Sequence, residues 1–246
     1  MQEHRPTSAI TSKELVTVPV VVTGDRSFRK NTMITLECAT RDAVISYTLN
    51  NEEEKIYDAP FQISRDSKLT VWASKKGATT SQKGLSYFTE METDKTIQLE
   101  SKYASQYAAG GNEALIDKLR GGTDFRNGTW QGYEGEDIIS IIDMGKKKKI
   151  SEVRMGFLQD ENSWIFMPTL FQVYVGDPDD WRLLGELENN AISPKDKGGI
   201  AKDFVVKEKA KTRYIKVVAN TLGTCPEYHK GAGYKCWLFS DEIIIK

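Results

Sequence analysis

The stretch Trp-Leu-Phe-Ser-Asp-Glu-Ile-Ile-Ile, residues 237–245, decides the fold together with Thr-Trp-Gln-Gly-Tyr at 129–133. The first stretch is rich in β-branched and aromatic residues, so it predicts a closing strand that carries an acidic pair. The second lies in a polar, aromatic loop ahead of a β-rich run that ends in Ile-Ile-Asp-Met-Gly at 141–145. An early strand that follows such a loop and a closing strand at the end of the chain together predict a β-sandwich. Its functional surface is expected on the loops.

Alternation of apolar and polar residues marks the first third of the chain. Apolar residues occupy every second position within 32–39, 44–49 and 69–73, and turn-forming residues separate these runs. Several short strands in so short a region are typical of a small immunoglobulin-like sandwich. We expect this domain at 15–90, after a disordered or artificial start at 1–14.

A polar, weakly patterned segment at 88–95 marks the expected domain boundary, and a second domain is predicted at 96–246. The lysine run at 146–149 is expected at a solvated hairpin tip. Because no long helical pattern alternates with strands, a parallel α/β sheet or a TIM barrel is disfavoured. The predicted fold class is all-β, with a jelly-roll sandwich second. Its strand candidates lie at 138–144, 150–157, 169–175, 181–188, 200–206, 213–219 and 237–245.

The overall charge argues against two broad classes of partner. Basic and acidic residues nearly balance, for a formal net charge of -1, so nothing favours nucleic acid or an anionic membrane. No apolar run approaches the roughly 18 residues that a membrane span needs. The start lacks the apolar stretch of a signal peptide, so an export signal is expected upstream of it.

Three cysteines are too few for a disulfide framework, and their spacing does not suit zinc. Cys225 and Cys236 flank one long loop. They would pair only in an oxidising compartment and with their α-carbons close enough together. The sequence leaves that pairing open.

The pair Asp241-Glu242 is the first candidate for catalysis, because paired carboxylates cleave glycosidic bonds. Adjacent residues of a regular strand point to opposite faces, so these side chains are not expected to flank one scissile bond. The histidines are His4 and His229, and neither lies in a recognisable nucleophile motif. The sequence therefore predicts no catalytic residue.

Hard oxygen ligands for a metal ion are present in two places. Asp117 precedes a glycine-rich polar loop at 121–124, and Glu242 comes from the last strand. Such a set suits Ca²⁺, which would tie an early loop to the final strand. The alternative is that these carboxylates are turn and capping residues without a metal.

Aromatic side chains in polar loops suggest a site for sugars, which present apolar C–H faces beside their hydroxyl groups. Trp130 and Trp237 lie against strand runs and are expected in the core. The predicted ligand-binding residues are Arg126, Tyr133, Glu134, Trp164 and His229.

The region 115–145 resembles the opening of discoidin, or coagulation factor 5/8 type C, domains, in which an Asp-Gly loop precedes a Trp and a strand ending in Asp-Leu-Gly. Arg-Tyr-Ile-Lys at 213–216 and the stretch at 237–245 are similar to later strands of that family. The resemblance is closer to the version found in bacterial family 20 β-N-acetylhexosaminidases, the chitobiases. It rests on Trp-Gln-Gly at 130–132, Ser-Trp-Ile-Phe-Met-Pro at 163–168 and the Cys-Pro-x-x-His-x-Gly-x-Gly loop at 225–233.

Tyr-Thr-Leu at 47–49 and Ile-Tyr-Asp-Ala-Pro-Phe at 56–61 resemble the small immunoglobulin-like domain that precedes the discoidin-like one in such enzymes. The family's catalytic signature, His-x-Gly-Gly-Asp-Glu, is not found in the sequence. The resemblance thus implies a non-catalytic accessory region with a discoidin-like, carbohydrate-binding second domain. It also implies a structural Ca²⁺ near Asp117 and Glu242, although Lys118 stands where the family has glycine.

The same resemblance implies glycans containing GlcNAc or galactose as ligands, a catalytic barrel of the same polypeptide as partner, and a periplasmic or extracellular location. The alternative is a purely structural buttress of the barrel or of a dimer, without sugar binding. A stand-alone enzyme is the third hypothesis. Solvent exposure of Tyr133, Trp164 and His229 separates the first two, because a sugar-binding surface has to be exposed.

Overall fold

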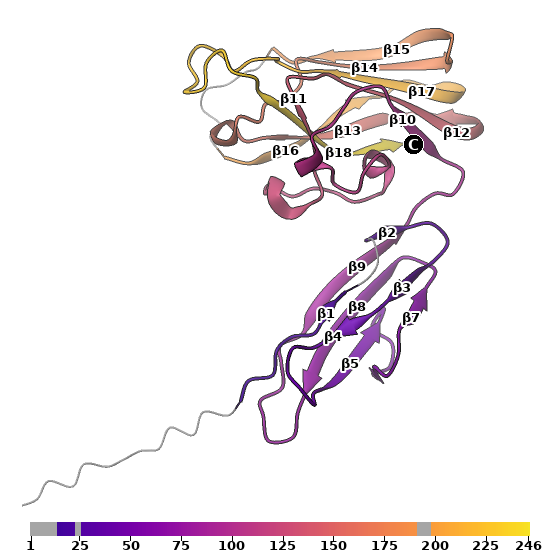
Figure 1. The fold of residues 1–246 in the computed structure, drawn as a ribbon. Coiled ribbons are helices and arrows are strands. Elements are labelled where there is room, and N and C mark those ends of the chain that lie inside the picture. The colour runs from indigo at the N-terminus through magenta and orange to yellow at the C-terminus, as the bar shows by residue number, and fades with distance from the viewer. Residues whose placement is uncertain (1–13, 23–25, 191–197) are drawn as a thin grey trace, which may run out of the picture. The chain divides into compact units, whose positions relative to one another are not determined.

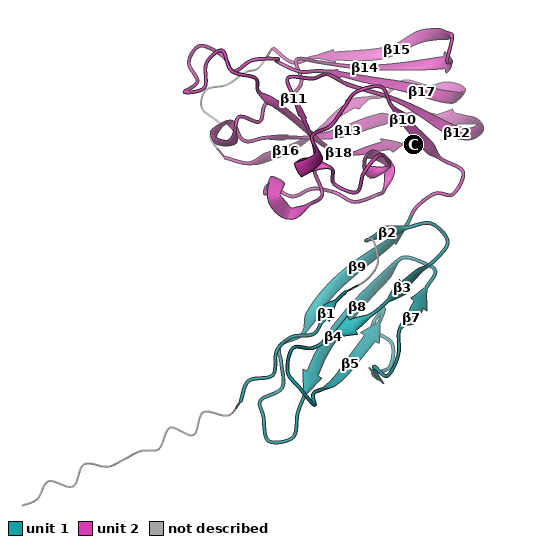
Figure 2. Ribbon diagram, viewed as in Figure 1, with its two compact units in different colours: residues 1–90 teal, residues 91–246 magenta. Residues whose placement is uncertain are grey.

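The computed structural model describes residues 14–22, 26–190 and 198–246. It confirms the predicted all-β class, with short 3-10 turns between the strands. The chain divides into two compact units, Met1–Glu90 and Met91–Lys246 (Figure 2), and the division falls within the polar segment 88–95. The expected disordered start lies outside the described residues, apart from Glu14. No helix among the described residues is long and apolar enough to cross a membrane.

Unit 1 is built from short strands (Figure 1). A five-stranded sheet has the order β2-β9-β8-β5-β6, and two smaller sheets are β1-β4 and β3-β7. The strands are β1 (Val20–Val21), β2 (Ser27–Phe28), β3 (Thr32–Ile34), β4 (Leu36–Glu37), β5 (Val44–Leu49), β6 (Lys55–Ile56), β7 (Phe61–Ile63), β8 (Ser67–Ser74) and β9 (Gly84–Glu90).

Regular alternation along β8 shows why unit 1 forms strands. Leu69, Val71 and Ala73 are buried, while Thr70 and Trp72 between them are half-buried on the outer face. This is the period of two that a sheet with one face on a core requires. Leu69 and Val71 pack with Ile34, Leu36 and Phe88 in one hydrophobic cluster.

Unit 2 consists of two antiparallel sheets, with strand orders β10-β12-β17-β14-β15 and β11-β18-β13-β16 (Figure 1). The strands are β10 (Thr96–Leu99), β11 (Gln131–Glu134), β12 (Ile138–Ile150), β13 (Val153–Gln159), β14 (Leu170–Asp177), β15 (Asp180–Glu188), β16 (Ile200–Val206), β17 (Ala210–Asn220) and β18 (Trp237–Ile245). The 3-10 turns are η1 (Ser105–Tyr107), η2 (Ala114–Ile116), η3 (Phe125–Asn127) and η4 (Glu161–Ser163).

Side chains from both sheets of unit 2 form one core. Ile142, Phe171 and Val217 come from the first sheet, and Phe157 and Ile243 come from the second; all five are fully buried. The two inner faces interdigitate in this way in β-sandwiches generally. The loops are therefore left at the edges and ends of the sandwich.

The lysine run at 146–149 corrects one prediction. These residues are not a hairpin tip, because β12 continues through them to Ile150. The pairing of β12 with β17 shifts register between Asp143 and Lys148, and Gly145 has φ 75° there. A bulge of this kind lets a strand bend and continue, so the polar run is absorbed into the strand.

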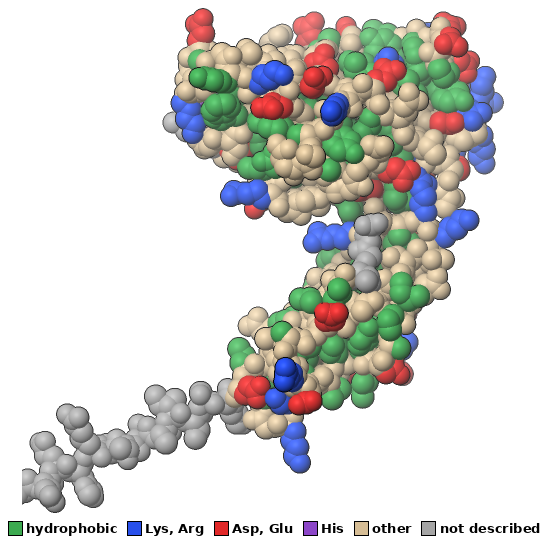
Figure 3. All heavy atoms as spheres, in the orientation of Figure 1, with side chains coloured by type: hydrophobic (Ala, Val, Ile, Leu, Met, Phe, Trp, Pro, Cys, Tyr) green, Lys and Arg blue, Asp and Glu red, His purple; other side chains and the backbone are tan. Residues whose placement is uncertain are grey.

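Figure 3 shows Lys and Arg side chains interspersed with Asp and Glu side chains on the visible face of unit 2. This mixture agrees with the near balance of charges in the sequence. Charge alone therefore does not mark the functional surface, which has to be found from the arrangement of the loops.

Candidate functional site

Two loops meet beside the start of β18. One follows β13 and contains η4, and the other joins β17 to β18. The Trp237 N–H donates to the Trp164 carbonyl at 2.8 Å, and the Phe166 N–H donates to the Trp237 carbonyl at 3.0 Å. Trp164 itself ends η4 in the left-handed conformation, with φ 66°. We call Trp164, Tyr228, His229 and Tyr234 the aromatic loop site.

His229 holds the two loops together. Its Nε2 lies 2.8 Å from the Glu161 carbonyl, which only accepts, so Nε2 carries the proton. Its Nδ1 accepts from the Gly231 N–H at 3.0 Å. The ring also meets Trp164 and Phe166 edge to face, with centroids 6.1 and 5.5 Å away. Both ring nitrogens are thus committed within the protein, and His229 positions the two loops relative to each other.

Tyr228 and Tyr234 give the aromatic loop site its exposed surface. Their exposed fractions are 49% and 68%, and the Tyr234 ring lies 5.9 Å from that of half-buried Trp164, tilted by 42°. A Cβ on Gly231 would lie 2.9 Å from the Trp164 ring, so the indole packs closely against this backbone. Burial and the Glu161 carboxylate raise the pKa of Tyr228. Tyr234 was missed in the sequence, although it shares the polar-loop setting of His229.

Tyr133 was predicted wrongly as a ligand-binding residue. It lies in β11, is fully buried, and its hydroxyl donates to Gln131 Oε1 at 2.6 Å. Gln131 Nε2 in turn donates to the Gly111 carbonyl at 2.9 Å. Burial raises the pKa of Tyr133, as expected for a phenol within the core. The prediction failed because the polar neighbours of Tyr133 indicated a loop, whereas the residue lies in a short strand whose alternate side chains face inward.

Arg126 and Glu134 are exposed, as expected for ligand contacts, but the contacts of Arg126 lie within its own turn. Its Nε donates to Asp124 Oδ1 at 3.0 Å, and its guanidinium lies 5.1 Å from the centroid of the Phe125 ring. Glu134 ends β11, opposite Trp237. Of the five predicted residues, the structure thus brings Trp164 and His229 into direct contact.

The predicted metal ligands, Asp117 and Glu242, are buried on the same side of the final strand. The Lys118 N–H donates to Glu242 Oε2 at 2.9 Å, and the Leu119 N–H donates to Asp117 Oδ1 at 2.7 Å. Burial and then the charge of Asp241 raise the pKa of Asp117 to about 7. Burial and then the charge of Asp117 raise the pKa of Glu242 to about 9.

Asp241 joins this acidic cluster, which corrects the expectation that it and Glu242 point apart. The pairing of β13 with β18 places the two carboxylates opposite Gly156 alone, so the strand is bulged there. Asp241 Oδ2 accepts from Arg120 Nε at 2.9 Å and from the Gly121 N–H at 2.8 Å. A bulge abolishes strict alternation, and both side chains consequently reach the same turn.

The acidic cluster fits a hard divalent cation in part. Asp241 Oδ1 is buried and has no hydrogen-bond partner, and two further carboxylates with raised pKa values lie beside it. Among the described residues, no group of three or more His, Cys, Asp or Glu side chains has the arrangement of a metal site. A bound Ca²⁺ would therefore need main-chain carbonyl oxygens as well, which Ca²⁺ sites commonly use.

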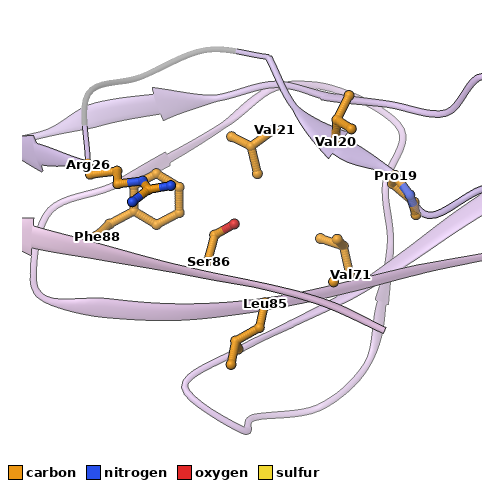
Figure 4. A pocket seen from close by; sticks show the side chains of 9 residues that line it. Pro19, Val20, Val21, Arg26, Val71, Leu85, Ser86 and Phe88 are labelled. Carbon is orange, nitrogen blue, oxygen red and sulfur yellow. The ribbon is translucent and has the colours of Figure 1, made fainter. Parts of the chain in front are cut away.

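Hollows lie elsewhere on the described surface, and one of about 250 Å³ adjoins the acidic cluster, with Lys118, Arg120 and Glu242 in its lining. One of about 340 Å³ lies in unit 1 between β1 and β9, where the Val21 side chain points toward Ser86 (Figure 4). Another of about 860 Å³ follows β10 and the segment after it, with Gln98 and Tyr103 in its lining. None of these three hollows is lined by a predicted ligand-binding residue.

No protein-family model and no curated protein matches the chain. Among solved structures, the C-terminal domain of a chitobiase from Bacteroides fragilis is 19% identical, with a TM-score of 0.41, over 63% of this chain and 95% of that one. A family 32 carbohydrate-binding module from C. perfringens, in complex with galactose, is 14% identical, with a TM-score of 0.38, over 62% and 93%. A Ruminococcus gnavus family GH29 fucosidase is 17% identical, with a TM-score of 0.38; the match covers 62% of this chain but only 25% of the fucosidase.

Proposed function

We propose that unit 2 binds glycan through the aromatic loop site and acts as a non-catalytic accessory domain of a glycoside hydrolase. The observation that carries this proposal is the exposure of Tyr228 and Tyr234, the second of which lies beside Trp164, on loops that His229 holds together. Aromatic faces stack on the apolar C–H faces of sugars, and Tyr hydroxyls add hydrogen bonds. Because such a surface buries little of its ligand, affinity for a single sugar is expected to be weak.

Removing one aromatic ring of the aromatic loop site is expected to weaken glycan binding. Calorimetric titration with GlcNAc and galactose oligomers should give saturable binding for the wild-type chain and a loss of about tenfold or more for Trp164→Ala or Tyr234→Ala, since one stacked ring contributes about 1 kcal/mol beyond its buried area. The matched control is Tyr87→Ala, which removes a tyrosine of unit 1 that is 59% exposed. Equal losses in all three variants would contradict the proposal.

The parent enzyme that we propose is a β-N-acetylhexosaminidase, secreted or periplasmic, with its catalytic barrel as the partner of these units. Support comes from the sequence motifs at 130–132, 163–168 and 225–233, which resemble the chitobiase version of the domain. Two of these motifs contribute residues to the aromatic loop site: Trp164 comes from 163–168, His229 comes from 225–233, and their rings are in contact.

The alternative, a purely structural buttress, is favoured by one of the three residues whose exposure separates the hypotheses. Tyr133 is fully buried, whereas Trp164 and His229 are half-buried. His229 also uses both ring nitrogens for hydrogen bonds to the protein's own backbone. On this view the aromatic loops stiffen one end of the sandwich and bind no sugar. The titration above distinguishes the two, because a buttress gives no saturable heat with any oligomer.

We also propose that the acidic cluster binds a structural Ca²⁺. Adding Ca²⁺ to chelator-treated protein should raise Tm, because an ion that binds only the folded state stabilises it by about 2.7 kcal/mol at a hundredfold excess over Kd. Support comes from the unpartnered Asp241 Oδ1 and from the mutual repulsion of Asp117 and Glu242.

The matched variant is Glu242→Gln, which keeps the shape of the side chain but removes the charge. Its Tm should not respond to Ca²⁺, whereas Glu188→Gln, which alters an exposed residue of β15, should respond as the wild type does. An unchanged Tm of the wild type across millimolar Ca²⁺ would refute the metal site, and Asp117 and Glu242 would then be turn-capping residues only.

A further inference from the structure

Within the loop that joins β17 to β18, the segment that carries Tyr228 and Tyr234 begins at Cys225 and ends at Cys236. The Cys225 N–H donates to the Tyr234 carbonyl at 2.8 Å, and the Cys236 N–H donates to the Gly223 carbonyl at 3.1 Å. An isolated antiparallel bridge lies between these two bonds. The two legs of the loop thus form a short ladder, and the cysteines occupy diagonal positions on it.

Both thiols face one apolar cluster. Cys225 and Cys236 are buried together with Phe166, and Trp164 and Leu222 pack against the three. Diagonal residues on one face of an antiparallel ladder lie about 7–8 Å apart, with their Cβ atoms somewhat closer, whereas a disulfide needs Cβ atoms about 4 Å apart. The two legs of the loop therefore have to approach each other for the bond to form. Gly223 next to the ladder has φ 81°, a conformation in which the chain turns without strain at glycine.

Burial also separates these thiols from solvent. Desolvation raises the pKa of Cys236 to about 11, with a smaller contribution from Cys225, so both are protonated in the closed loop. A protonated, buried thiol reacts slowly with a soluble oxidant. Bond formation is therefore expected while the loop is open, during folding or local unfolding.

We propose that Cys225 and Cys236 are a dithiol–disulfide site that closes the loop into a covalent ring. The oxidant is a small-molecule disulfide of the glutathione type. One protein thiolate attacks it, forming a mixed disulfide and releasing one glutathione thiol; the second protein thiolate then displaces the second glutathione thiol. The two protein thiols lose their protons to the departing thiolates, so the products are one protein disulfide and two reduced glutathione molecules.

The ring fixes the segment that carries Tyr228 and Tyr234. In the dithiol form, this segment depends on main-chain hydrogen bonds and on His229 for its shape. A covalent closure orders it in advance, which lowers the entropy that a ligand would otherwise have to remove. The effect on glycan affinity rests on the proposed function, whereas the bond and the stiffening of the loop do not.

The test uses the full chain carrying Cys38→Ser, so that only the two loop thiols remain. The protein is unfolded in urea and refolded either with oxidised and reduced glutathione or with dithiothreitol. It is then alkylated, and its mass is measured by mass spectrometry. Refolding with glutathione should leave no alkylatable thiol and a chain two hydrogens lighter. Trypsin cleavage after exposed Lys230 and Lys235 should be slowed several-fold, and dithiothreitol should restore it.

Cys225→Ala with Cys236→Ala in the same background is the matched control, and its cleavage rate should be the same in both buffers. Two alkylatable thiols, or two glutathione adducts, after oxidative refolding would overturn the site. A disulfide that leaves cleavage unchanged would overturn the stiffening of the loop. If the disulfide forms and slows cleavage while neither form binds GlcNAc or galactose oligomers, the dithiol site stands and the proposed glycan function fails.

Discussion

Gly156→Ala is expected to lower the free energy of unfolding of unit 2 by about 3 kcal/mol, because a methyl group there collides with the buried carboxylate of Asp241 and with its ion-pair partner Arg120. A Cβ on Gly156 would lie 2.8 Å from Arg120 Nη2 and 3.0 Å from Asp241 Cγ, and closer still to Asp241 Oδ1. Asp241 is 1% exposed and cannot move into water without losing its contacts with Arg120 and the Gly121 N–H. Urea denaturation followed by tryptophan fluorescence measures the loss.

The matched control for this substitution is Gly122→Ala. A Cβ at Gly122 would approach only Asn127 Nδ2, at 3.9 Å, so stability should change by less than about 0.5 kcal/mol. Equal midpoints for Gly156→Ala and the wild type would show that the bulge at Asp241 and Glu242, opposite Gly156, is not formed in this way. The shared orientation of the acidic cluster would then lose its structural basis.

Trp130→Ala is the second large effect, with an expected loss of about 3–5 kcal/mol, the usual range for a fully buried tryptophan. Trp130 is 1% exposed and packs with Leu158, Ile165 and Phe239. Its Nε1–H also donates to the Gly122 carbonyl at 3.1 Å, so the ring ties the glycine-rich loop to the sandwich. Thermal unfolding should show a lower Tm together with loss of any Ca²⁺ response.

Trp181→Ala provides the comparison, because Trp181 is half-buried at the edge strand β15 and should contribute much less. A Trp130→Ala protein as stable as Trp181→Ala would place Trp130 outside the core and leave the adjoining loop unsupported. The prediction that Trp130 belongs to the core was made from its position against a strand run, and its burial confirms it.

Several β-strands were predictable from the alternation of apolar and polar residues. Alternation alone locates β5 and β8 in unit 1 and β17 in unit 2, because a sandwich imposes the same period on every such strand. The alternation pattern does not identify a strand where the strand contains a run of charged residues. Lys146–149 would end most strands, yet a bulge carries β12 through them. No local property of a lysine run reveals such a bulge.

The candidate site was predictable only in part, for related reasons. Polar neighbours place Trp164 and His229 in loops, as the structure has them, but the same criterion puts buried Tyr133 in a loop as well. Strands as short as β11 have too few residues to show a period. The bulge that turns Asp241 beside Glu242 depends on Gly156 in a different strand, which sequence spacing does not show.

The measurement that tests the central claim most directly is mapping of backbone amide chemical shifts in the isotope-labelled chain during titration with GlcNAc and galactose oligomers. Glycan binding at the aromatic loop site predicts saturable shifts concentrated in residues 160–165 and 225–236. Shifts concentrated along the groove of Gln98 and Tyr103 beside β10, or none at millimolar oligomer, would contradict it.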